Sequence, residues 1–586
     1  MDIPKGMKTE RKTKINVPAL IADTLALLTG EITMDKPKPT NFNNYNEYIC
    51  KNSASSMDIV AQRVEPLDPS PLISIGILCC GDDRSKALDT TLLSLIGQTN
   101  ANWEAVIVLD LKQSGLERFD NVQNIRLIIA DGDEAELTQL MNEEMDGAYT
   151  MRLMPGDSLT PDALYAMVQA TYPVPGTEVV FSDSERAFKP DYSRYTLASF
   201  DSVGRPIMVS RNVFRSIGGF MGSSWEDNWL YNLKACSEAK HTAHVARVLL
   251  STTAVETGSV VSERMLANIE KIFRCERCKV KVYRGNNTAT ARLRVNARHN
   301  PKTSIIIPNV DSYENIKRCI ESIDMQCTYR SYKIYIAMCK NIAEYDERTK
   351  RYLEALKRDK IINIVNAFDA DCMSEILNKC IRESLSEAMI FLNGSCELLT
   401  SDFVEELTGL AMLREIGAVG GKILDEQGDI LSVGTVVGIG GWADSPYRGT
   451  RDDECDELKL SVTGVQRCVT AVSSAFMAIE GEKLLNSGMF DETMKGVGFD
   501  TELCIRLMRK GFKNCFTPYA KAKLYGQLPD YDKASNQDLL RCYDAYRQTL
   551  FTGDKFYNAN FDWATIVPQL AIKPFKPIEL NPLYKK

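Results

Sequence analysis

Acidic residues stand directly after several apolar runs that have the length of buried strands. Asp110 closes the run WEAVIVLD, and Gly156 and Asp157 follow the run AYTMRLM. The run LISIGILCC ends at Cys79 and is followed by Asp82. In open α/β sheets ligands bind beyond the carboxyl ends of the strands, so these residues are candidates for one site. Asp110 could accept hydrogen bonds from a base or a ribose, and Asp157 could hold Mg²⁺ or Mn²⁺ against a diphosphate, because these cations prefer hard oxygen ligands.

Asp157 also has a simpler interpretation. Thr160 and Pro161 follow it in the stretch MRLMPGDSLTPDAL, and such a pair is typical of a capped helix start with proline in the first turn. Asp157 could then be only a turn acid before that helix. The local sequence does not distinguish the two roles, so the choice depends on the other residues of the site.

The elements that must position these residues alternate from Pro71 onward. LISIGILCC and WEAVIVLD are apolar runs of strand length, and RSKALDTTLLSLIGQ between them has helical spacing. IRLIIA, EAELTQLMNEEM and AYTMRLM continue the alternation. This order predicts a mostly parallel, twisted sheet that is covered by helices on both faces.

The same order of runs recurs from Thr303 onward. TSIIIPNV matches ISIGILCC, YKIYIAM matches WEAVIVL, and EAMIFLNGSCELL matches GAYTMRLMPGDSL. A duplicated domain explains this best. We therefore expect two tandem α/β domains, the first copy at 71–262 and the second copy at 301–560, joined by a linker at 263–300. A partly ordered extension at 1–70, with a short helix at VPALIADTLALL, and a tail at 561–586 complete the predicted organisation.

Composition limits the class of protein. The chain has 586 residues, too many for one hydrophobic core, and a net charge of −8 at pH 7. No Lys/Arg cluster is long or interleaved with aromatic residues, so we do not expect nucleic acid as a partner. The 17 cysteines and the lack of a secretory apolar segment favour reduced thiols in the cytoplasm. No apolar run is long enough for a membrane span, whereas peripheral contact with a membrane stays open.

The ordered fragments resemble the family 2 glycosyltransferases of GT-A fold, especially the bacterial type with two such domains in tandem. In the first copy the resemblance rests on ISIGILCC, SLIGQTNANWEAVIVLD, MPGDSLTPDAL, VVFSDSERAFKPDYS, RNVFRSIGGF and WEDNWLYNL. In the second it rests on SIIIPNVDSYENIKRCIESI, FLNGSCELL, EIGAVGGKILDEQGDILSVGTVVGIGG, GMFDETMKGVGFDTELCIRLMRKGF and TPYAKAKLYGQ. Each fragment alone is weak, but the same order twice along one chain is a strong indication.

The resemblance implies transfer of a sugar from a nucleotide-diphosphate donor to an acceptor hydroxyl, with inversion at the anomeric carbon. It implies that Asp82 and Asp110 bind the nucleotide-sugar, with Cys79 and Gly156 at the same strand ends. It assigns the divalent cation, Mn²⁺ or Mg²⁺, to Asp157.

The same resemblance assigns the catalytic base to Asp227 of WEDNW, with Glu226 beside it. A helix that begins there would keep the Asp227 carboxylate ionised through its dipole. The alternative is that Asp227 is only a cap or first-turn acid of that helix.

Both copies depart from the family pattern. In the first copy, Met154 replaces the leading acid of the metal motif and Ser251 stands at the late histidine position. The second copy has Met338 for the nucleotide-binding acid, Ser395 for the metal acid, and Gly526 or Gln527 for the late histidine, while Asp500 and Glu502 remain at the start of the catalytic helix. Because a thioether and a hydroxyl do not replace carboxylates around a cation, we expect the first copy to be the active one if only one turns over. Asp500 is then the catalytic candidate of a second copy that is a structural partner, an acceptor-binding module or a relic.

Two further patterns have more than one interpretation. Cys275 and Cys278, with His241 and His244, have ligand-like spacings, but their order matches no zinc finger, and two unrelated pairs are the simpler interpretation. The glycine-rich VGTVVGIGGWADSPYRG lacks the strand-then-helix context of a dinucleotide site, so we expect a loop over the second cleft. Its Trp442, Tyr447 and Arg448 could bind a sugar or pack between the domains.

We therefore expect an inverting glycosyltransferase that builds a surface polysaccharide or modifies a glycan, lipid or protein acceptor. It would act in the cytoplasm or at the inner face of the membrane. The alternative is a catalytically inactive pseudo-glycosyltransferase that serves as a binding or assembly protein, since acids and histidines of the family pattern are missing in both copies.

Overall fold

The computed structural model describes residues 45–80, 85–110, 122–185, 187–252, 260–274, 278–297, 299–453 and 457–572. Asp82, Cys275 and the helix expected at VPALIADTLALL lie outside these residues.

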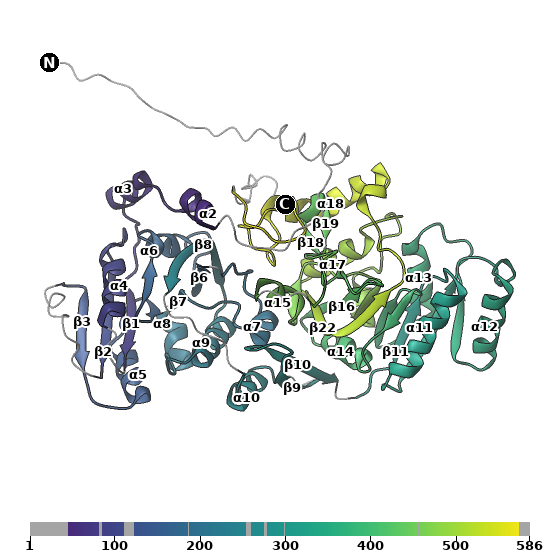
Figure 1. The fold of residues 1–586 in the computed structure, drawn as a ribbon, viewed down its shortest axis with the longest axis horizontal. Coiled ribbons are helices and arrows are strands. Elements are labelled where there is room, and N and C mark those ends of the chain that lie inside the picture. Colours follow the sequence, from purple (N-terminus) through teal and green to yellow (C-terminus); the bar gives the residue numbers. More distant parts are fainter. Residues whose placement is uncertain are drawn as a thin grey trace, which may run out of the picture. The chain divides into compact units, whose positions relative to one another are not determined.

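The first sheet is formed by strands between residues 73 and 252 (Figure 1). Its spatial order is β3-β2-β1-β4-β7-β6-β8-β5. Strands β1 to β4 pair in parallel with one another and β6 is parallel to β8, whereas β7 and β5 pair antiparallel with their neighbours. The strands are β1 (Ile73–Cys79), β2 (Trp103–Leu109), β3 (Ile125–Ile129), β4 (Tyr149–Leu153), β5 (Asp157–Leu159), β6 (Val179–Ser184), β7 (Ile207–Ser210) and β8 (Thr242–Thr252). The helices are α2 (Tyr45–Asn52), α3 (Ser56–Val64), α4 (Ser85–Ile96), α5 (Glu134–Glu143), α6 (Ala163–Gln169), α7 (Arg194–Ser199), α8 (Arg211–Ile217) and α9 (Trp225–Glu238).

Strand β1 is apolar except for Ser74 because both of its faces are covered. Every residue of β1 is buried. On one face its isoleucines join a core with Leu88, Leu92 and Leu95, which lie on one side of α4. On the other face Gly76 leaves room for α5, since a Cβ atom there would lie 2.9 Å from the sulfur atoms of Met141 and Met145. The continuous apolar run in the sequence is thus explained by two-sided burial.

The second sheet repeats the first. Its order is β13-β12-β11-β14-β21-β16-β22-β15, which is the first order with each strand replaced by its counterpart in the second copy. The strands are β11 (Thr303–Ile307), β12 (Tyr332–Met338), β13 (Ile362–Asn366), β14 (Ala388–Leu392), β15 (Cys396–Leu398), β16 (Ile416–Leu424), β17 (Ile430–Ser432), β20 (Arg467–Val469), β21 (Phe476–Glu480) and β22 (Lys513–Leu524), with β18 (Val436–Val437) and β19 (Ala443–Asp444) as a separate pair. The helices are α11 (Tyr313–Gln326), α12 (Glu347–Arg358), α13 (Met373–Ser384), α14 (Phe403–Ala411), α15 (Glu457–Thr463), α16 (Gly481–Asn486), α17 (Phe499–Arg509) and α18 (Asn536–Thr552), and the 3₁₀ turns are η2 (Ile342–Glu344), η3 (Ile439–Gly441) and η4 (Tyr531–Lys533). The predicted fold class, two tandem α/β domains with mostly parallel sheets flanked by helices, is confirmed.

A helix and a hairpin connect the two sheets. They are α10 (Glu263–Ile272), β9 (Cys278–Arg284) and β10 (Ala291–Ala297), and β9 pairs antiparallel with β10. Leu293 and Val295 of the hairpin belong to the same hydrophobic core as residues of both sheets. The connector is therefore packed against the domains that it joins.

The chain after α18 returns to the first copy. We call residues 554–572 the C-terminal segment. Its Tyr557, Phe561 and Leu570 share a hydrophobic cluster with Tyr48 of α2 and Phe188 of the first copy. The segment therefore contacts elements that are remote from it in the sequence.

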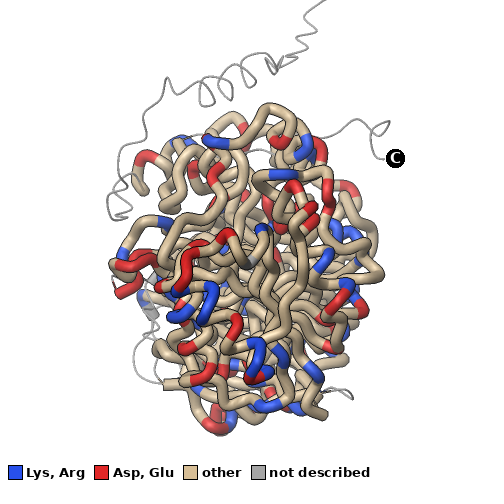
Figure 2. The backbone as a smooth tube through the Cα atoms, turned by 90° about the vertical axis from the view of Figure 1, so that its right-hand side faces the viewer, with Lys and Arg blue, Asp and Glu red and all other residues tan. Residues whose placement is uncertain are grey.

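Among the helices that the structure describes, none combines the length and the apolar composition that crossing a bilayer requires. Acidic and basic positions are interspersed over the side of the chain that Figure 2 shows.

Candidate functional site

The ends of β1 and β2 in the first copy lie together. The N–H of Asp110 donates to the carbonyl of Cys79 across 3.3 Å, so the ends of β2 and β1 are neighbours. The Cys79 side chain is fully buried in the core. The N–H of Gly156 donates to the hydroxyl of Thr91 at 2.9 Å and to the carbonyl of Ala87 at 3.0 Å. The donor-binding roles of Cys79, Asp110 and Gly156 stay predictions, and Asp82 is not described.

Asp157 is the first residue of β5 and its side chain is fully buried. Its Oδ2 accepts a hydrogen bond from the Met154 N–H at 2.8 Å and pairs with the Arg205 guanidinium at 2.7 Å. Burial raises the pKa of Asp157, while the charge of Arg205 opposes this shift. The carboxylate thus closes its own turn and neutralises an arginine, and a divalent cation would have to displace that guanidinium. The metal role of Asp157 stays a prediction that its described surroundings do not fit.

The two copies give Asp157 a different counterpart from the one expected. Strand β15 begins at Cys396, and the Cys396 N–H donates to Asn393 at 2.9 Å just as the Asp157 N–H donates to Met154 at 2.9 Å. Asp157 therefore corresponds to the buried Cys396 and not to Ser395, whose counterpart is Gly156. Asp157 and Cys396 each begin the last strand of their sheet, and both side chains are buried.

Glu226 and Asp227 connect two helices. Asp227 accepts a hydrogen bond from the hydroxyl of Ser224, the N-cap of α9, at 2.6 Å, and forms an ion pair with Arg264 of α10. Glu226 accepts hydrogen bonds from the N–H and hydroxyl of Ser262, the N-cap of α10, at 2.6 and 2.5 Å. Asp157 and Asp227 thus have different arginine partners, and no described hydrogen bond or ion pair joins them. Their catalytic roles stay predictions, and their contacts are those of capping residues.

The second copy presents a half-buried acid beside a hollow. Asp500, in the first turn of α17, accepts a hydrogen bond from the Ser474 N–H at 3.0 Å. Burial raises its pKa. The hollow has a volume of about 110 Å³ and lies beyond the carboxyl ends of β14 and β16; Asp444 and Arg448 also line it. Burial likewise raises the pKa of Asp444, although Arg448 pairs with it at 2.6 Å.

Trp442 and Tyr531 form an aromatic wall of this hollow, with their rings stacked at 6.4 Å and an interplanar angle of 6°. The three residues that the glycine-rich loop suggested therefore differ in role. Trp442 and Arg448 line the hollow, whereas Tyr447 is 1% exposed and packs in the core. A sugar could contact the first two but not Tyr447.

A second group of oxygen atoms lies across one short loop from Asp500. Ser395 donates from its hydroxyl to Oδ2 of Asp311 at 2.6 Å, and Asn309 donates to the same oxygen at 2.8 Å. Asn393 lies in the same turn, and its N–H donates to the carbonyl of Ala475 at 2.9 Å. The loop of Ser474 and Ala475 therefore contacts Asp500 on one side and this turn on the other. Sequence reasoning missed Asp311, which follows β11 within the motif SIIIPNVDSYENIKRCIESI.

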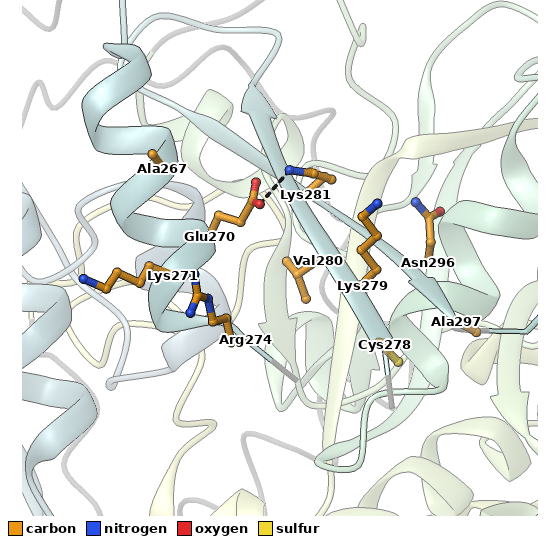
Figure 3. A pocket seen from close by; sticks show the side chains of 10 residues that line it. All are labelled: Ala267, Glu270, Lys271, Arg274, Cys278, Lys279, Val280, Lys281, Asn296 and Ala297. Atoms are coloured by element: carbon orange, nitrogen blue, oxygen red, sulfur yellow. Dashed lines mark hydrogen bonds and ion pairs between the residues drawn. The ribbon is translucent and has the colours of Figure 1, made fainter. Parts of the chain in front are cut away.

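The connector between the domains carries a cationic hollow of about 990 Å³ (Figure 3). Lys271 and Arg274 come from the α10 region and Lys279 and Lys281 from β9. Its acid, Glu270, pairs with Lys281 at 2.7 Å. Because that carboxylate is engaged, the described part of this hollow has no acid available as a base.

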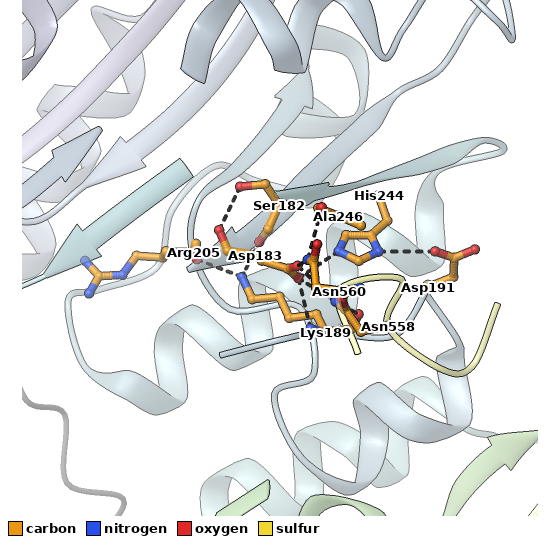
Figure 4. A network of polar contacts seen from close by, with 9 residues as sticks. All are labelled: Ser182, Asp183, Lys189, Asp191, Arg205, His244, Ala246, Asn558 and Asn560. Carbon is orange, nitrogen blue, oxygen red and sulfur yellow. Dashed lines mark hydrogen bonds and ion pairs between the residues drawn. The ribbon is translucent and has the colours of Figure 1, made fainter. Parts of the chain in front are cut away.

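A buried carboxylate of the first copy holds the C-terminal segment (Figure 4). Asp183 is fully buried, and Asn558 donates to it at 2.9 and 3.0 Å and Asn560 at 2.8 Å. His244 approaches Asp183 with Nε2 at 3.0 Å and Asp191 with Nδ1 at 3.2 Å. Both nitrogens of His244 are therefore occupied by carboxylates, which leaves none for the zinc site considered above.

The His244 contacts predict a loss of stability at alkaline pH. Burial alone would lower the pKa of His244, but the charges and hydrogen bonds of Asp183 and Asp191 raise it to about 9. Since this lies above the unfolded value of about 6.5, the ion pairs contribute fully below pH 6.5 and their contribution disappears as the pH rises to 9. We expect the free energy of unfolding to fall by about 3 kcal/mol over this range, measured by denaturant titration at each pH. The His244→Gln variant should lose this slope and His299→Gln, at an exposed ion pair, should keep it; equal slopes in both would contradict the assignment.

Comparison with known proteins gives distant relatives. No model of a known protein family matches the chain. It is similar to the O-antigen biosynthesis protein RfbC of Myxococcus xanthus, at 25% identity over 600 residues that cover 94% of this chain and 45% of that protein. It is also similar to the uncharacterized protein y4gI of Sinorhizobium fredii (strain NBRC 101917 / NGR234), at 24% identity over 498 residues, or 79% of this chain and 54% of that protein. The chain thus spans about half the length of the curated relatives that it matches.

Two solved structures align with part of the chain. GalNAc-T7 with UDP, GalNAc and Mn²⁺ aligns with a TM-score of 0.34 and 14% identity over 44% of this chain and 50% of that chain. The mannosyltransferase PcManGT from Pyrobaculum calidifontis, in complex with GDP-Man and Mn²⁺, aligns with a TM-score of 0.29 and 13% identity over 40% of this chain and 59% of that chain.

Proposed function

We propose that this chain is a glycosyltransferase that moves a sugar from a nucleotide-diphosphate donor to an acceptor hydroxyl in the synthesis of a surface polysaccharide or another glycoconjugate. Two observations support the proposal: the similarity to a protein named for O-antigen biosynthesis, and the repeated α/β domain whose strand ends carry acids. The observation that carries it is Asp500, a half-buried acid at the start of a helix beside a hollow with an aromatic wall.

We further propose that the second copy carries the reaction, contrary to the preference from sequence alone. Asp500 would accept the proton of the acceptor hydroxyl as the acceptor oxygen bonds to the anomeric carbon. The bond from that carbon to the diphosphate breaks, and its electron pair leaves with the diphosphate. One base and one displacement suffice for inversion. Burial supports this role, because a raised pKa makes the Asp500 carboxylate a stronger base.

A divalent cation fits the second copy better than Asp157. Asp311, Ser395 and Asn393 offer oxygen ligands, but only one of them is a carboxylate. Mg²⁺ and similar cations are commonly bound by one or two carboxylates together with substrate phosphates. We therefore propose that Mn²⁺ or Mg²⁺ joins Asp311 together with the donor, and that it would stabilise the charge on the leaving diphosphate.

This proposal predicts that cation and nucleotide bind together. Titration calorimetry with UDP or GDP should show binding in the presence of Mn²⁺ and at least about tenfold weaker binding in its absence, since about 1.4 kcal/mol corresponds to tenfold. Asp311→Asn should remove the Mn²⁺ effect, whereas Asp371→Asn, an exposed acid of the same copy, should not. The wild-type chain should also transfer sugar from at least one member of a panel of nucleotide sugars. Absence of binding by every nucleotide in the panel would overturn the function.

The inactive alternative has support of its own. Arg205 occupies the carboxylate of Asp157, and the second copy has Cys396, which carries no carboxylate, at the position that corresponds to Asp157. A pseudo-glycosyltransferase would bind nucleotide or glycan without transfer. The rate of transfer in the wild-type chain, compared with the Asp500 variant considered in the Discussion, separates the two. The location at the inner face of the membrane and the peripheral membrane contact stay predictions.

A further inference from the structure

Three remote parts of the chain enclose a hollow of about 940 Å³. One wall comes from α2 and α3, with Lys51, Asn52 and Ala54. Another comes from β8 of the first copy and the loops beside it, and the third from the end of α18 and the C-terminal segment. The residues that line it differ from those of the hollow beside Asp500. It is therefore a separate candidate site.

Three charged side chains of this hollow have charged partners within the protein. Arg247 pairs with Asp162, and Lys51 pairs with Glu47 at 2.6 Å. His244 lies between Asp183 and Asp191. An ionic ligand would have to compete with these contacts. The cationic hollow of the connector, where one acid stands among four basic side chains, suits a phosphate better.

The remaining lining suits hydroxyl groups. Asn558 and Asn560 are held in place by Asp183, so the floor of the hollow is organised before any ligand arrives. Tyr48, Tyr557 and Trp563 add aromatic side chains to the lining. The amides of Asn52 and Gln62 and the carboxylate of Asp191 also line the hollow. Such groups can exchange hydrogen bonds with hydroxyls, and aromatic rings pack against apolar C–H groups. The volume of this hollow, about 940 Å³, lies near the upper end of the range for ligand sites, which reaches about 1,000 Å³.

We infer that this hollow binds a short, uncharged oligosaccharide, a segment of the acceptor glycan. The inference rests on the proposed function for the identity of the glycan as acceptor, but its binding step requires neither donor nor transfer. α2, α3 and the C-terminal segment thereby become parts of a binding site.

Binding of defined oligosaccharides tests the inference. The probes are maltotriose, mannotriose and chitotriose, each titrated into the full chain without nucleotide and followed by saturation-transfer-difference NMR. We expect at least one to bind, and Arg247→Ala to weaken it by about tenfold or more, since loss of a charged hydrogen-bonding group costs about 1.5–3 kcal/mol. Arg126→Ala is the matched control, because Arg126 forms an arginine–carboxylate pair with Glu144 elsewhere in the same copy.

Two tryptophan variants test the inference even if Arg247→Ala fails to fold. Ala54→Trp adds a large side chain at the wall of the hollow and removes no hydrogen-bonding side chain, so it should block the oligosaccharide. Ala101→Trp, on an exposed loop of the same copy, should not. Binding by none of the probes, or equal binding by the Ala54→Trp and Ala101→Trp variants, overturns the inference. Binding of UDP or pyrophosphate at this hollow instead would also overturn it.

The outcome is separable from that of the proposed function. Asp500→Asn should lose transfer and keep oligosaccharide binding. A chain that binds the oligosaccharide but never transfers sugar would support the inference and contradict the enzyme. A chain that transfers sugar and binds no probe at this hollow would support the enzyme and contradict the inference.

Discussion

Asp500→Asn will lower the rate of sugar transfer by about 10²–10⁴-fold, the range typical of a lost general base. The amide has nearly the size of the carboxylate but cannot accept the acceptor proton. It can still receive the Ser474 N–H through its oxygen, so we expect the fold and nucleotide binding to survive. The measurement is the steady-state rate of nucleotide diphosphate release with saturating donor and acceptor.

The control for this variant lies in the same helical turn. Glu502 pairs with Arg506 one turn further along α17 and does not line the hollow. Glu502→Gln should therefore change the rate by only a small factor. Equal rates of sugar transfer for wild type and Asp500→Asn would indicate that the reaction takes place at another site. A similar loss in both variants would indicate a structural effect of α17 and not a base.

Asp183→Ala will release the C-terminal segment from the first copy. The substitution leaves a charged His244 and the amides of Asn558 and Asn560 without their shared acceptor. Breaking a buried pair by removing one partner costs about 3–5 kcal/mol. Amide hydrogen exchange in residues 554–563 should therefore be faster by about two to four powers of ten, because each tenfold corresponds to about 1.4 kcal/mol.

A neighbouring acid provides the comparison. Asp191 contacts the other nitrogen of His244, but its side chain is 53% exposed. Because solvent screens such a pair, Asp191→Asn should change exchange in the same segment by about 1 kcal/mol or less. Asp183→Ala should also abolish the pH dependence attributed to His244. Unchanged exchange in Asp183→Ala would mean that aromatic packing of Tyr557 and Phe561 alone holds the segment.

The same hollow relates these results to the oligosaccharide inference. Asn558 and Asn560 line it only while Asp183 holds them. Asp183→Ala should therefore weaken oligosaccharide binding together with the docking of the segment, whereas Asp500→Asn should affect neither. The two substitutions divide the chain into a binding function and a transfer function that can be measured independently.

The sequence by itself determined the architecture of this protein. Apolar runs such as that of β1 and the helical spacing of leucines in α4 are local patterns. These patterns indicate directly whether an element is buried on one face or on two. The repeat of these patterns after Thr303 was sufficient to predict the second sheet, because the same alternation leads to the same strand order. It also placed Asp500 at the start of a helix.

Only the tertiary structure decided what the acids contact. The position of Asp157 after a strand suggests a cation ligand, but its buried side chain pairs with Arg205, 48 residues later. The sequence around Asp183 gives no sign of its role, because its partners Asn558 and Asn560 are 375 and 377 residues away. The residues next to a carboxylate in the sequence do not indicate whether it will contact a distant guanidinium, an amide or solvent. The strands follow from local periodicity, whereas the charge state and availability of a site acid depend on contacts that form only when the chain has folded.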